Sequence, residues 1–410
     1  MPDGESPAPE LPRSAAADGP APRIHDVAIV GAGPVGVFFA AALAQRGIDV
    51  VVFDKRSRAH RHSRAIGIHP PSLAALGRLG VLDEIVVAGV RIDRGVLRIH
   101  GRERARLDFA STGAQLPFVV SLPQLETERI LRTRLAELAP DALRTGVEVL
   151  RVGREAASVR LDLGGGLPSV RARMAVGADG LSGVVAAALG QRGAGRSYPY
   201  RYLMGDFADA TGDGALAVLH LHPSGIVESF PLPAGRRRWV THLPAGVGDE
   251  SADAALLARL IAERIAPEAA PDPATATMSS AFGVRRRILS RMASDDGRLA
   301  VIGDAAHEVS PIGGQGMNLG WLDADALAER MPALLAALGS PPHDAASPLA
   351  DLGRARLRSA RAAARISEFN MTMGRPTSAA GFALRRAVVA TASLPPLGRT
   401  LARAFTMHDR

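Results

Sequence analysis

A glycine-rich turn near the N-terminus constrains the fold of this sequence more than any other feature. Gly31, Gly33 and Gly36 directly follow an apolar run over residues 24–30, and residues 34–46 have the composition of a helix. A glycine fingerprint between a strand and a helix is typical of the βαβ unit that binds a dinucleotide. Gly31 allows the tight turn, Gly33 lets a pyrophosphate approach the backbone, and Gly36 permits close packing of the helix on the strand.

The chain that follows this helix completes the expected unit. Residues 48–53 form a second apolar run, which ends at Asp54. In such units an acidic residue about 20 positions beyond the fingerprint binds the ribose hydroxyls of adenosine. We therefore expect an α/β fold that begins with a Rossmann-like, dinucleotide-binding domain.

A second glycine-rich segment lies far downstream. The apolar run 299–302 predicts a buried parallel strand that leads to Asp304, and a helix is expected over residues 317–330. Ligands of open α/β sheets bind at the carboxyl ends of the strands, which is where Asp304 falls. The N-terminus of the helix favours an anion or a developing negative charge. Between strand and helix lie three glycines that let the backbone approach a ligand, namely Gly313, Gly314 and Gly316.

A third motif, Gly177-Ala178-Asp179-Gly180, follows the strand predicted over residues 171–176. With its three motifs in this order and spacing, the sequence resembles the FAD-dependent aromatic hydroxylases, which are single-component flavoprotein monooxygenases typified by para-hydroxybenzoate hydroxylase. The resemblance covers residues 24–335.

The resemblance implies a cofactor, two co-substrates and a substrate class. FAD is expected to be bound non-covalently, with NADPH or NADH as the electron donor. The reduced flavin reacts with O2, and a C4a-hydroperoxide transfers one oxygen atom to a phenolic, polyketide-like or quinone-like ring. The cofactor-binding residues expected from the fingerprint and from the family motifs are Gly31, Gly33, Pro34, Val35, Gly36, Asp54, Lys55, Arg64, Gln124, Asp179, Asp304, Pro311, Gly314, Gly316, Met317 and Asn318.

The sequence departs from the family in one motif. The family has a Ser and then an Arg after the aspartate–glycine pair, where this chain has Gly183 and Ala186. The departure bears on recognition of the nicotinamide cofactor. Two alternatives therefore stay open: a flavin-dependent reductase or dehydrogenase of the same fold, and a non-catalytic flavin-binding partner protein.

The pattern predicts an α/β fold with an inserted domain. Residues 1–23 have no apolar periodicity and are expected to form a disordered tail. Short strands separated by turn residues predict an antiparallel sheet for the substrate domain, and C-terminal helices follow it. The expected segments are 24–88, 121–190 and 281–335 for the FAD-binding domain, 89–120 and 191–280 for the substrate domain, and 336–410 for the C-terminal helical region.

No motif identifies a catalytic residue. Tyr200 and Tyr202 share one face of a predicted strand, and His220 and His222 share a face of another. These side chains are weak candidates, because Tyr or His can polarise or deprotonate a phenolic hydroxyl. His307 is expected to shape the turn after its strand rather than to act as a base.

Composition excludes several classes of function. The chain has no Cys, which excludes disulfides, thiolate catalysis and Cys-ligated metals. The net charge of +8 comes almost entirely from scattered Arg, so no nucleic-acid site is expected. His60, His62 and His69 lack partners at metal-ligand spacing, so no metal site is expected either. With no signal peptide and no long apolar run, the chain is expected to be a cytoplasmic monomer or homodimer. The apolar and basic segment 382–405 fits packing on the core better than weak contact with a membrane surface.

Overall fold

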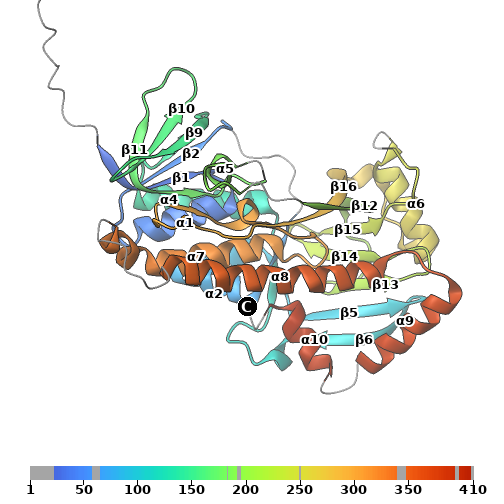
Figure 1. Ribbon diagram of the computed structural model, residues 1–410. Helices are drawn as coiled ribbons and strands as arrows, with labels where there is room; N and C mark the ends of the chain where they lie inside the picture. Colours follow the sequence, from blue (N-terminus) through green and yellow to red (C-terminus); the bar gives the residue numbers. More distant parts are fainter. Residues whose placement is uncertain are drawn as a thin grey trace, which may run out of the picture.

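The computed structural model describes residues 23–57, 65–181, 183–191, 195–248, 251–338, 348–392 and 397–407. Figure 1 shows two sheet-containing bodies side by side, with one long helix, α8 (Pro348–Gly374), running along both. The expected mixed α/β fold is confirmed. The tail predicted at residues 1–23 lies, but for Arg23, outside the described residues.

The three sequence motifs each follow a strand of the first sheet. Its strand order is β8-β2-β1-β11-β10-β9, and β17 pairs with the carboxyl end of β11. β1, β2, β8, β11 and β17 are parallel, whereas β9 and β10 are antiparallel. Because β1, β11 and β17 are neighbours, the motifs at their carboxyl ends meet at one edge. The bounds are β1 Ile24–Val30, β2 Val50–Asp54, β8 Leu143–Thr145, β9 Val149–Arg154, β10 Val159–Leu163, β11 Val170–Gly177 and β17 Leu299–Val301.

Helices cover this sheet and form one large core with it. α1, which the fingerprint leads into, packs against α4 and α7. α1 is almost entirely apolar and buried from Gly36 to Leu43, as expected for a helix enclosed on all sides. The bounds are α1 Pro34–Ala44, α2 Pro70–Leu79, α3 Leu82–Ala88, α4 Gln124–Leu138, α5 Val184–Ala188 and α7 Gly316–Ala337.

The second sheet has the order β18-β16-β12-β15-β14-β13-β5-β6. It draws on two segments that are far apart in sequence, since β5 and β6 precede α4 while β12 to β15 follow α5. Its pairs are antiparallel except for β13 with β5. α6 (Ala254–Arg264) packs on β12 and β15. The bounds are β5 Arg94–Ile99, β6 Arg102–Asp108, β12 Arg196–Ala208, β13 Ala217–Leu221, β14 Val227–Leu232, β15 Arg236–His242, β16 Met278–Ile288 and β18 His307–Glu308.

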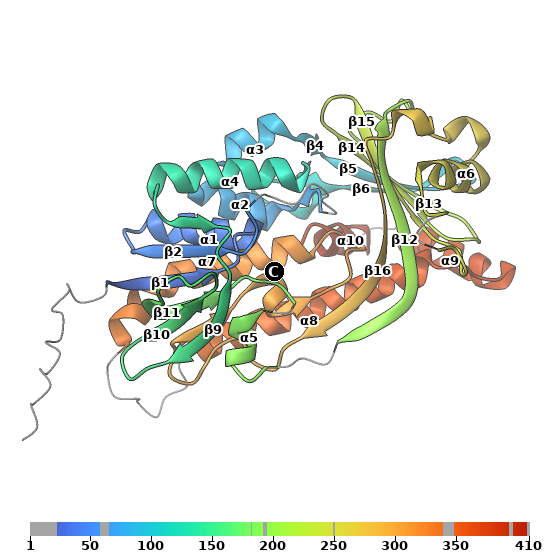
Figure 2. The ribbon, with the colours of Figure 1, turned by 90° about the horizontal axis from the view of Figure 1, so that it is seen from above.

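β4 and α10 lie between the two bodies (Figure 2). A small sheet, β3-β7-β4, pairs Gly67–Ile68 with Val119–Ser121 and Val90–Ile92. The C-terminal helices α9 (Ala379–Ala392) and α10 (Leu397–Phe405) pack beside β6. Within the described ranges, every helix is too short or too polar to cross a membrane.

Candidate functional site

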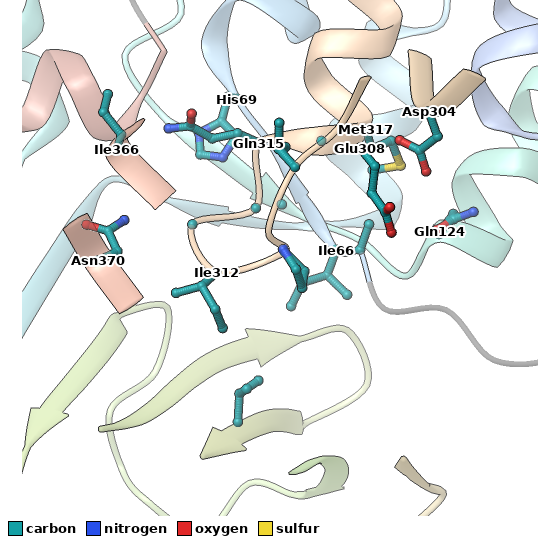
Figure 3. A pocket seen from close by; sticks show the side chains of 18 of the residues that line it. Ile66, His69, Gln124, Asp304, Glu308, Ile312, Gln315, Met317, Ile366 and Asn370 are labelled. Atoms are coloured by element: carbon teal, nitrogen blue, oxygen red, sulfur yellow. The ribbon is translucent and has the colours of Figure 1, made fainter. Parts of the chain in front are cut away.

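One large cavity lies between the two sheets and has a volume of about 1480 Å³. Pockets for a single drug-sized ligand typically measure about 300–1,000 Å³, so this cavity has room for a dinucleotide and a second molecule. Figure 3 shows Gln124, Asp304 and Glu308 at one end, and Ile366 and Asn370 of α8 at the other.

The glycine fingerprint is packed tightly on one side and open on the other. A Cβ on Gly31 would lie 2.5 Å from the carbonyl oxygen of Ala178, and Gly31 has φ +101°. A Cβ on Gly36 would lie 2.0 Å from the carbonyl oxygen of Gly31. Gly33, by contrast, has no neighbouring atom within 4 Å of its Cβ position and lines the cavity. The backbone at Gly33 is therefore bare where a pyrophosphate would approach.

Asp54 lies at the end of β2, and both of its carboxylate oxygens accept hydrogen bonds. Oδ1 accepts hydrogen bonds from the backbone N–H of Arg56 at 2.9 Å and from its Nε at 3.1 Å, while Oδ2 accepts from Nη2 of Arg56 and from the N–H of Ala32. Burial opposes ionisation of Asp54, but the hydrogen bonds from Arg56 outweigh it and lower the pKa. An adenosine ribose would have to share this carboxylate with Arg56 or displace the guanidinium.

Among the described residues, only one of the two carboxylate oxygens of Asp179 has a hydrogen-bond partner. Oδ2 accepts a hydrogen bond from the N–H of Val184 at 2.8 Å, at the start of α5. Oδ1 is buried and has no partner among the described residues. Burial raises the pKa of Asp179 to about 6. A buried, unsatisfied carboxylate oxygen on the cavity wall indicates a place for a ligand's hydroxyl group.

Asp304 faces the cavity from the short 3-10 turn Gly303–Ala305 that follows β17. The turn requires φ +60° at Gly303, a conformation that favours glycine. Desolvation by the surrounding protein raises the pKa of Asp304, although the charges of His307 and Arg287 oppose the shift. The carboxylate is therefore held at the carboxyl edge of the parallel sheet, where a sugar-like hydroxyl chain could donate to it.

Hydrogen bonds of one buried side chain hold the glycine loop before α7 in place. Gly313 and Gly314 have φ values of +105° and +66°. The buried side chain of Asn318 donates to the carbonyl oxygens of Gly67 and Gly314, and its Oδ1 accepts from the N–H of His69. These bonds tie the loop to β3 and leave the N-terminus of α7 pointing into the cavity. Residues Gly313 to Met317 line the cavity there.

Gly33, Asp179 and Asp304 together form a cradle on the cavity wall. Its bare backbone and its carboxylates suit the pyrophosphate and the hydroxyl groups of FAD. A family model described as "FAD binding domain" matches residues 25–343. The 6-methylpretetramide 4-monooxygenase of Streptomyces rimosus is 34% identical over 326 residues, which is 77% of this chain and 56% of that protein. The chain belongs to the FAD-dependent aromatic hydroxylases.

Two further proteins are similar to this hydroxylase over most of its length. The aromatic compound monooxygenase YhjG of Bacillus subtilis strain 168, itself described as uncharacterized, is 28% identical over 94% of this chain and 76% of its own. The crystal structure of p-nitrophenol 4-monooxygenase PnpA from Pseudomonas putida DLL-E4 has a TM-score of 0.82 and 24% identity, over 94% of this chain and 99% of that chain. At this identity the likeness to PnpA shows the fold alone.

Most of the residues expected to bind the flavin line the hydroxylase cavity. Gly36 and Asn318 do not line it, because Gly36 packs against Gly31 and Asn318 holds the loop. Arg64 lies outside the described residues. Gln124 donates to Glu128 at 2.7 Å and still faces the cavity. The residues on the wall are Gly31, Gly33, Pro34, Val35, Asp54, Lys55, Gln124, Asp179, Asp304, Pro311, Gly314, Gly316 and Met317.

His307 is a buried structural residue, as expected. Its side chain is fully buried, and its Nε2 lies 2.5 Å from Oδ2 of Asp323 on α7. Oδ1 of Asp323 accepts from Nε of Arg356 on α8 at 2.7 Å. Burial opposes the charge on His307, but Asp323 outweighs it and raises the pKa. This network joins α8 to α7 and to β18.

The four weak catalytic candidates lie outside the cavity wall. Tyr202 stacks on Phe282, which does line the cavity, but Tyr202 itself is covered. The hydroxyl of Tyr200 accepts from Arg375. On β13 the alternate residues Ala217, Leu219 and Leu221 face the cavity, which turns His220 to the opposite face of the sheet. His222 follows the strand and bonds the N–H of Ser224. None of the four contacts the cavity, so none is placed to touch a substrate.

Sequence reasoning missed several charged residues that line the cavity, among them Glu228 on β14 and Arg238 on β15. Arg238 is paired with Asp206 through two hydrogen bonds of 2.7 and 2.8 Å. The signal for Glu228 was present in the alternation of residues around β14. With a period of two, Glu228 falls between Ile226 and Phe230 on one face.

The C-terminal helices also contribute to the cavity wall. Phe405 of α10 stacks on Phe109 with ring centroids 5.6 Å apart, and both rings line the cavity. Among the described residues, no three His, Asp or Glu side chains gather in a way that could hold a metal ion. His60 and His62 lie outside the described residues.

Proposed function

We propose that this hydroxylase uses NADH or NADPH and O2 to hydroxylate a phenolic, polyketide-like or quinone-like aromatic ring through a flavin C4a-hydroperoxide. The observation that carries the proposal is the continuity of the cavity. It runs from the nucleotide cradle at Gly33 and Asp179, past the glycine loop at Gly313, to a mostly apolar wall of the second sheet. A flavin held by the cradle could therefore face a second, apolar molecule without a barrier between them.

The protein's own residues supply binding, orientation and exclusion of water. The bare backbone at Gly33 receives a pyrophosphate, and the carboxylates of Asp179 and Asp304 accept hydrogen bonds from sugar-like hydroxyls. The partial positive charge at the N-terminus of α7 favours negative charge on a reduced ring system beside it. Leu219, Val240 and other apolar side chains keep water from the reacting ring.

An anaerobic titration of the FAD-loaded protein with NADH and with NADPH tests the electron donor. We expect the flavin absorbance to bleach slowly with the donor alone and at least about tenfold faster when an aromatic substrate is present, because substrate binding commits the active site to reduction. A panel of phenols, naphthols and hydroxyquinones identifies the class that accelerates bleaching. Incorporation of one oxygen atom from labelled O2 into the product then tests the monooxygenase step.

One observation favours an alternative. Gly183 and Ala186 replace the family's Ser and Arg, and Asp179 occupies the space that a side chain at residue 183 would need. If a nicotinamide bleaches the flavin and a substrate double bond changes without labelled oxygen in the product, the protein is a reductase or dehydrogenase. If no nicotinamide bleaches the flavin with any ligand, it is a flavin-binding partner protein or is reduced by another protein.

The C-terminal helices support a proposal of weak membrane-surface contact. Phe369 on α8 lines the cavity and is 53% exposed, and Leu384 on α9 is 68% exposed. Large apolar side chains that reach solvent beside a cavity suit an apolar substrate taken from a lipid surface. Co-sedimentation with anionic lipid vesicles, compared with a Phe369→Ser, Leu384→Ser double variant, tests this contact.

A further inference from the structure

The carboxyl group of Glu228 interrupts an apolar part of the cavity wall on the second sheet. Glu228 on β14 lies opposite Val240 on β15 and opposite Leu219 on β13. Both neighbours line the cavity, as does Met204, which is paired with Val240 on the next strand. Across the sheet the row therefore reads Met, Val, Glu, Leu, and a charged residue stands where the pattern requires an apolar one.

Among the residues that the structure describes, Glu228 has no hydrogen-bond or ion-pair partner. It is 8% exposed. Its neighbours differ in this respect, because Arg238 on the same face is paired with Asp206. A buried carboxyl without a partner destabilises the fold, and such departures from the packing rules concentrate at functional sites.

The wall around Glu228 adjoins the loop that faces the flavin. Ile312, which precedes Gly313, packs in one hydrophobic cluster with Met204 and Val240. Figure 3 shows Ile312 reaching from the loop toward the strands of the second sheet. Val240 thus contacts the loop's cluster on one side and pairs with Glu228 on the other. A flat molecule lying against this wall would have one edge at Glu228 and its face near the loop.

We propose that Glu228 is a catalytic residue that binds a phenolic hydroxyl of the substrate and accepts its proton. The substrate class is a flat, largely apolar hydroxyarene. In the step, the O–H bond of the phenol breaks, a new O–H bond forms on the Glu228 carboxylate, and the electron pair stays on the phenolate oxygen. The ring becomes richer in electrons, and the proton returns to water after product leaves. The assignment rests on the proposed function, since the phenolate is what an aromatic hydroxylation needs.

The environment of Glu228 suits this role. Burial raises its pKa to about 7, so the group can exchange a proton near neutral pH. The titratable and charged groups on the same sheet face or on the cavity wall around it are Tyr202 and Asp206 on β12, Arg238 and His242 on β15, Arg106 on β6, Arg285 on β16 and Arg365 on α8. Burial keeps His242 neutral, with a pKa of about 4, and raises the pKa of Tyr202, so neither exchanges a proton near pH 7.

Binding of matched probes to the oxidised, FAD-loaded protein tests the proposal without turnover. The probes are 2-hydroxyanthraquinone, whose absorbance reports ionisation of its hydroxyl, and 2-methoxyanthraquinone, which has no hydroxyl. We expect the wild type to bind the hydroxyl probe at least about tenfold more tightly than the methyl ether, which corresponds to a single hydrogen bond to a charged group. The preference should grow as pH rises through 7 and Glu228 ionises.

Two variants and one control separate the outcomes. Glu228→Leu should bring the preference for the hydroxyl probe to about onefold, and Glu228→Gln should leave only the pH dependence that ionisation of the free probe, measured in buffer, produces. The control Phe230→Leu changes the same strand face and should shift both probes equally. FAD content and the melting temperature check that each variant is folded, and either glutamate variant suffices for the test.

Distinct results overturn the two proposals. Three results would overturn the role of Glu228: an unchanged preference in Glu228→Leu, a pH dependence in Glu228→Gln as large as that of the wild type, or failure of the wild type to bind the hydroxyl probe. If the probe results hold but no labelled oxygen reaches any product, the Glu228 site stands as a phenol-binding site and the hydroxylase activity fails.

Discussion

A Cβ on Gly183 would lie 2.1 Å from Oδ1 of Asp179. The carboxylate therefore occupies the space that a side chain at residue 183 would need, and it accepts a hydrogen bond from the N–H of Val184 in the first turn of α5. Glycine at residue 183 thus makes room for an aspartate that faces the cavity.

Gly183→Ser should displace this carboxylate. We expect the affinity for FAD to fall by about tenfold, equivalent to about 1.4 kcal/mol, because one hydrogen bond at the edge of the cradle is lost. Equilibrium dialysis of FAD against the apoprotein measures the change. Gly180→Ser is a useful comparison because Gly180 has φ +74°, so backbone strain rather than contact with Asp179 would weaken binding there. An unchanged FAD affinity in Gly183→Ser would mean that Asp179 does not contact the cofactor.

Gly33 and Gly36 should respond differently to added side chains. Gly33→Val should leave the stability of the apoprotein within about 0.5 kcal/mol, because nothing lies near its Cβ position, yet weaken FAD binding by at least about tenfold. Gly36→Ala should destabilise the apoprotein by about 2 kcal/mol, because its Cβ meets the carbonyl of Gly31. Urea unfolding and FAD dialysis on both variants separate the two effects. Equal losses of stability would contradict the distinction.

The buried network of His307, Asp323 and Arg356 should contribute strongly to stability. Asp323→Asn removes the negative charge that His307 and Arg356 both contact, and we expect the free energy of unfolding to fall by about 3 kcal/mol or more. Asp325→Asn, two residues further along α7, is a matched control. Asp325 pairs with Arg78, whose side chain is 55% exposed, so its loss should change the stability by less than about 1 kcal/mol. Denaturant unfolding of the two variants at pH 7 makes the comparison.

Glu228 should make the stability of the protein fall as pH rises. Its pKa of about 7 in the folded state lies above the usual value near 4.5. The folded state therefore holds its proton more tightly, and the stabilising effect is complete below pH 4.5 and lost as pH rises through 7. Glu228→Gln should remove this dependence. Between pH 5 and pH 8 the wild type should lose about 2 kcal/mol relative to the variant. Parallel pH profiles of the two unfolding free energies would show that Glu228 does not titrate near neutrality.

The sequence by itself determined the cofactor domain. The fingerprint around Gly31, the acid at Asp54 and the glycine loop after Asp304 each predicted local structure, because glycine freedom and strand or helix periodicity act over a few residues. The first strand was predicted at residues 24–30 and is found as Ile24–Val30. The neighbouring positions of β1, β11 and β17 then brought the motifs together at one edge.

Only the tertiary structure decided which residues face the cavity. Tyr200 and His220 looked like candidates because a period of two shows that residues share a face, but it does not show which face is covered by the rest of the protein. The pairing of β13 with β5, from a distant segment, turned His220 away from the cavity. The same sheet placed Glu228 on the cavity wall beside Val240. These placements follow from long-range strand pairing and packing, which no local pattern in the sequence encodes.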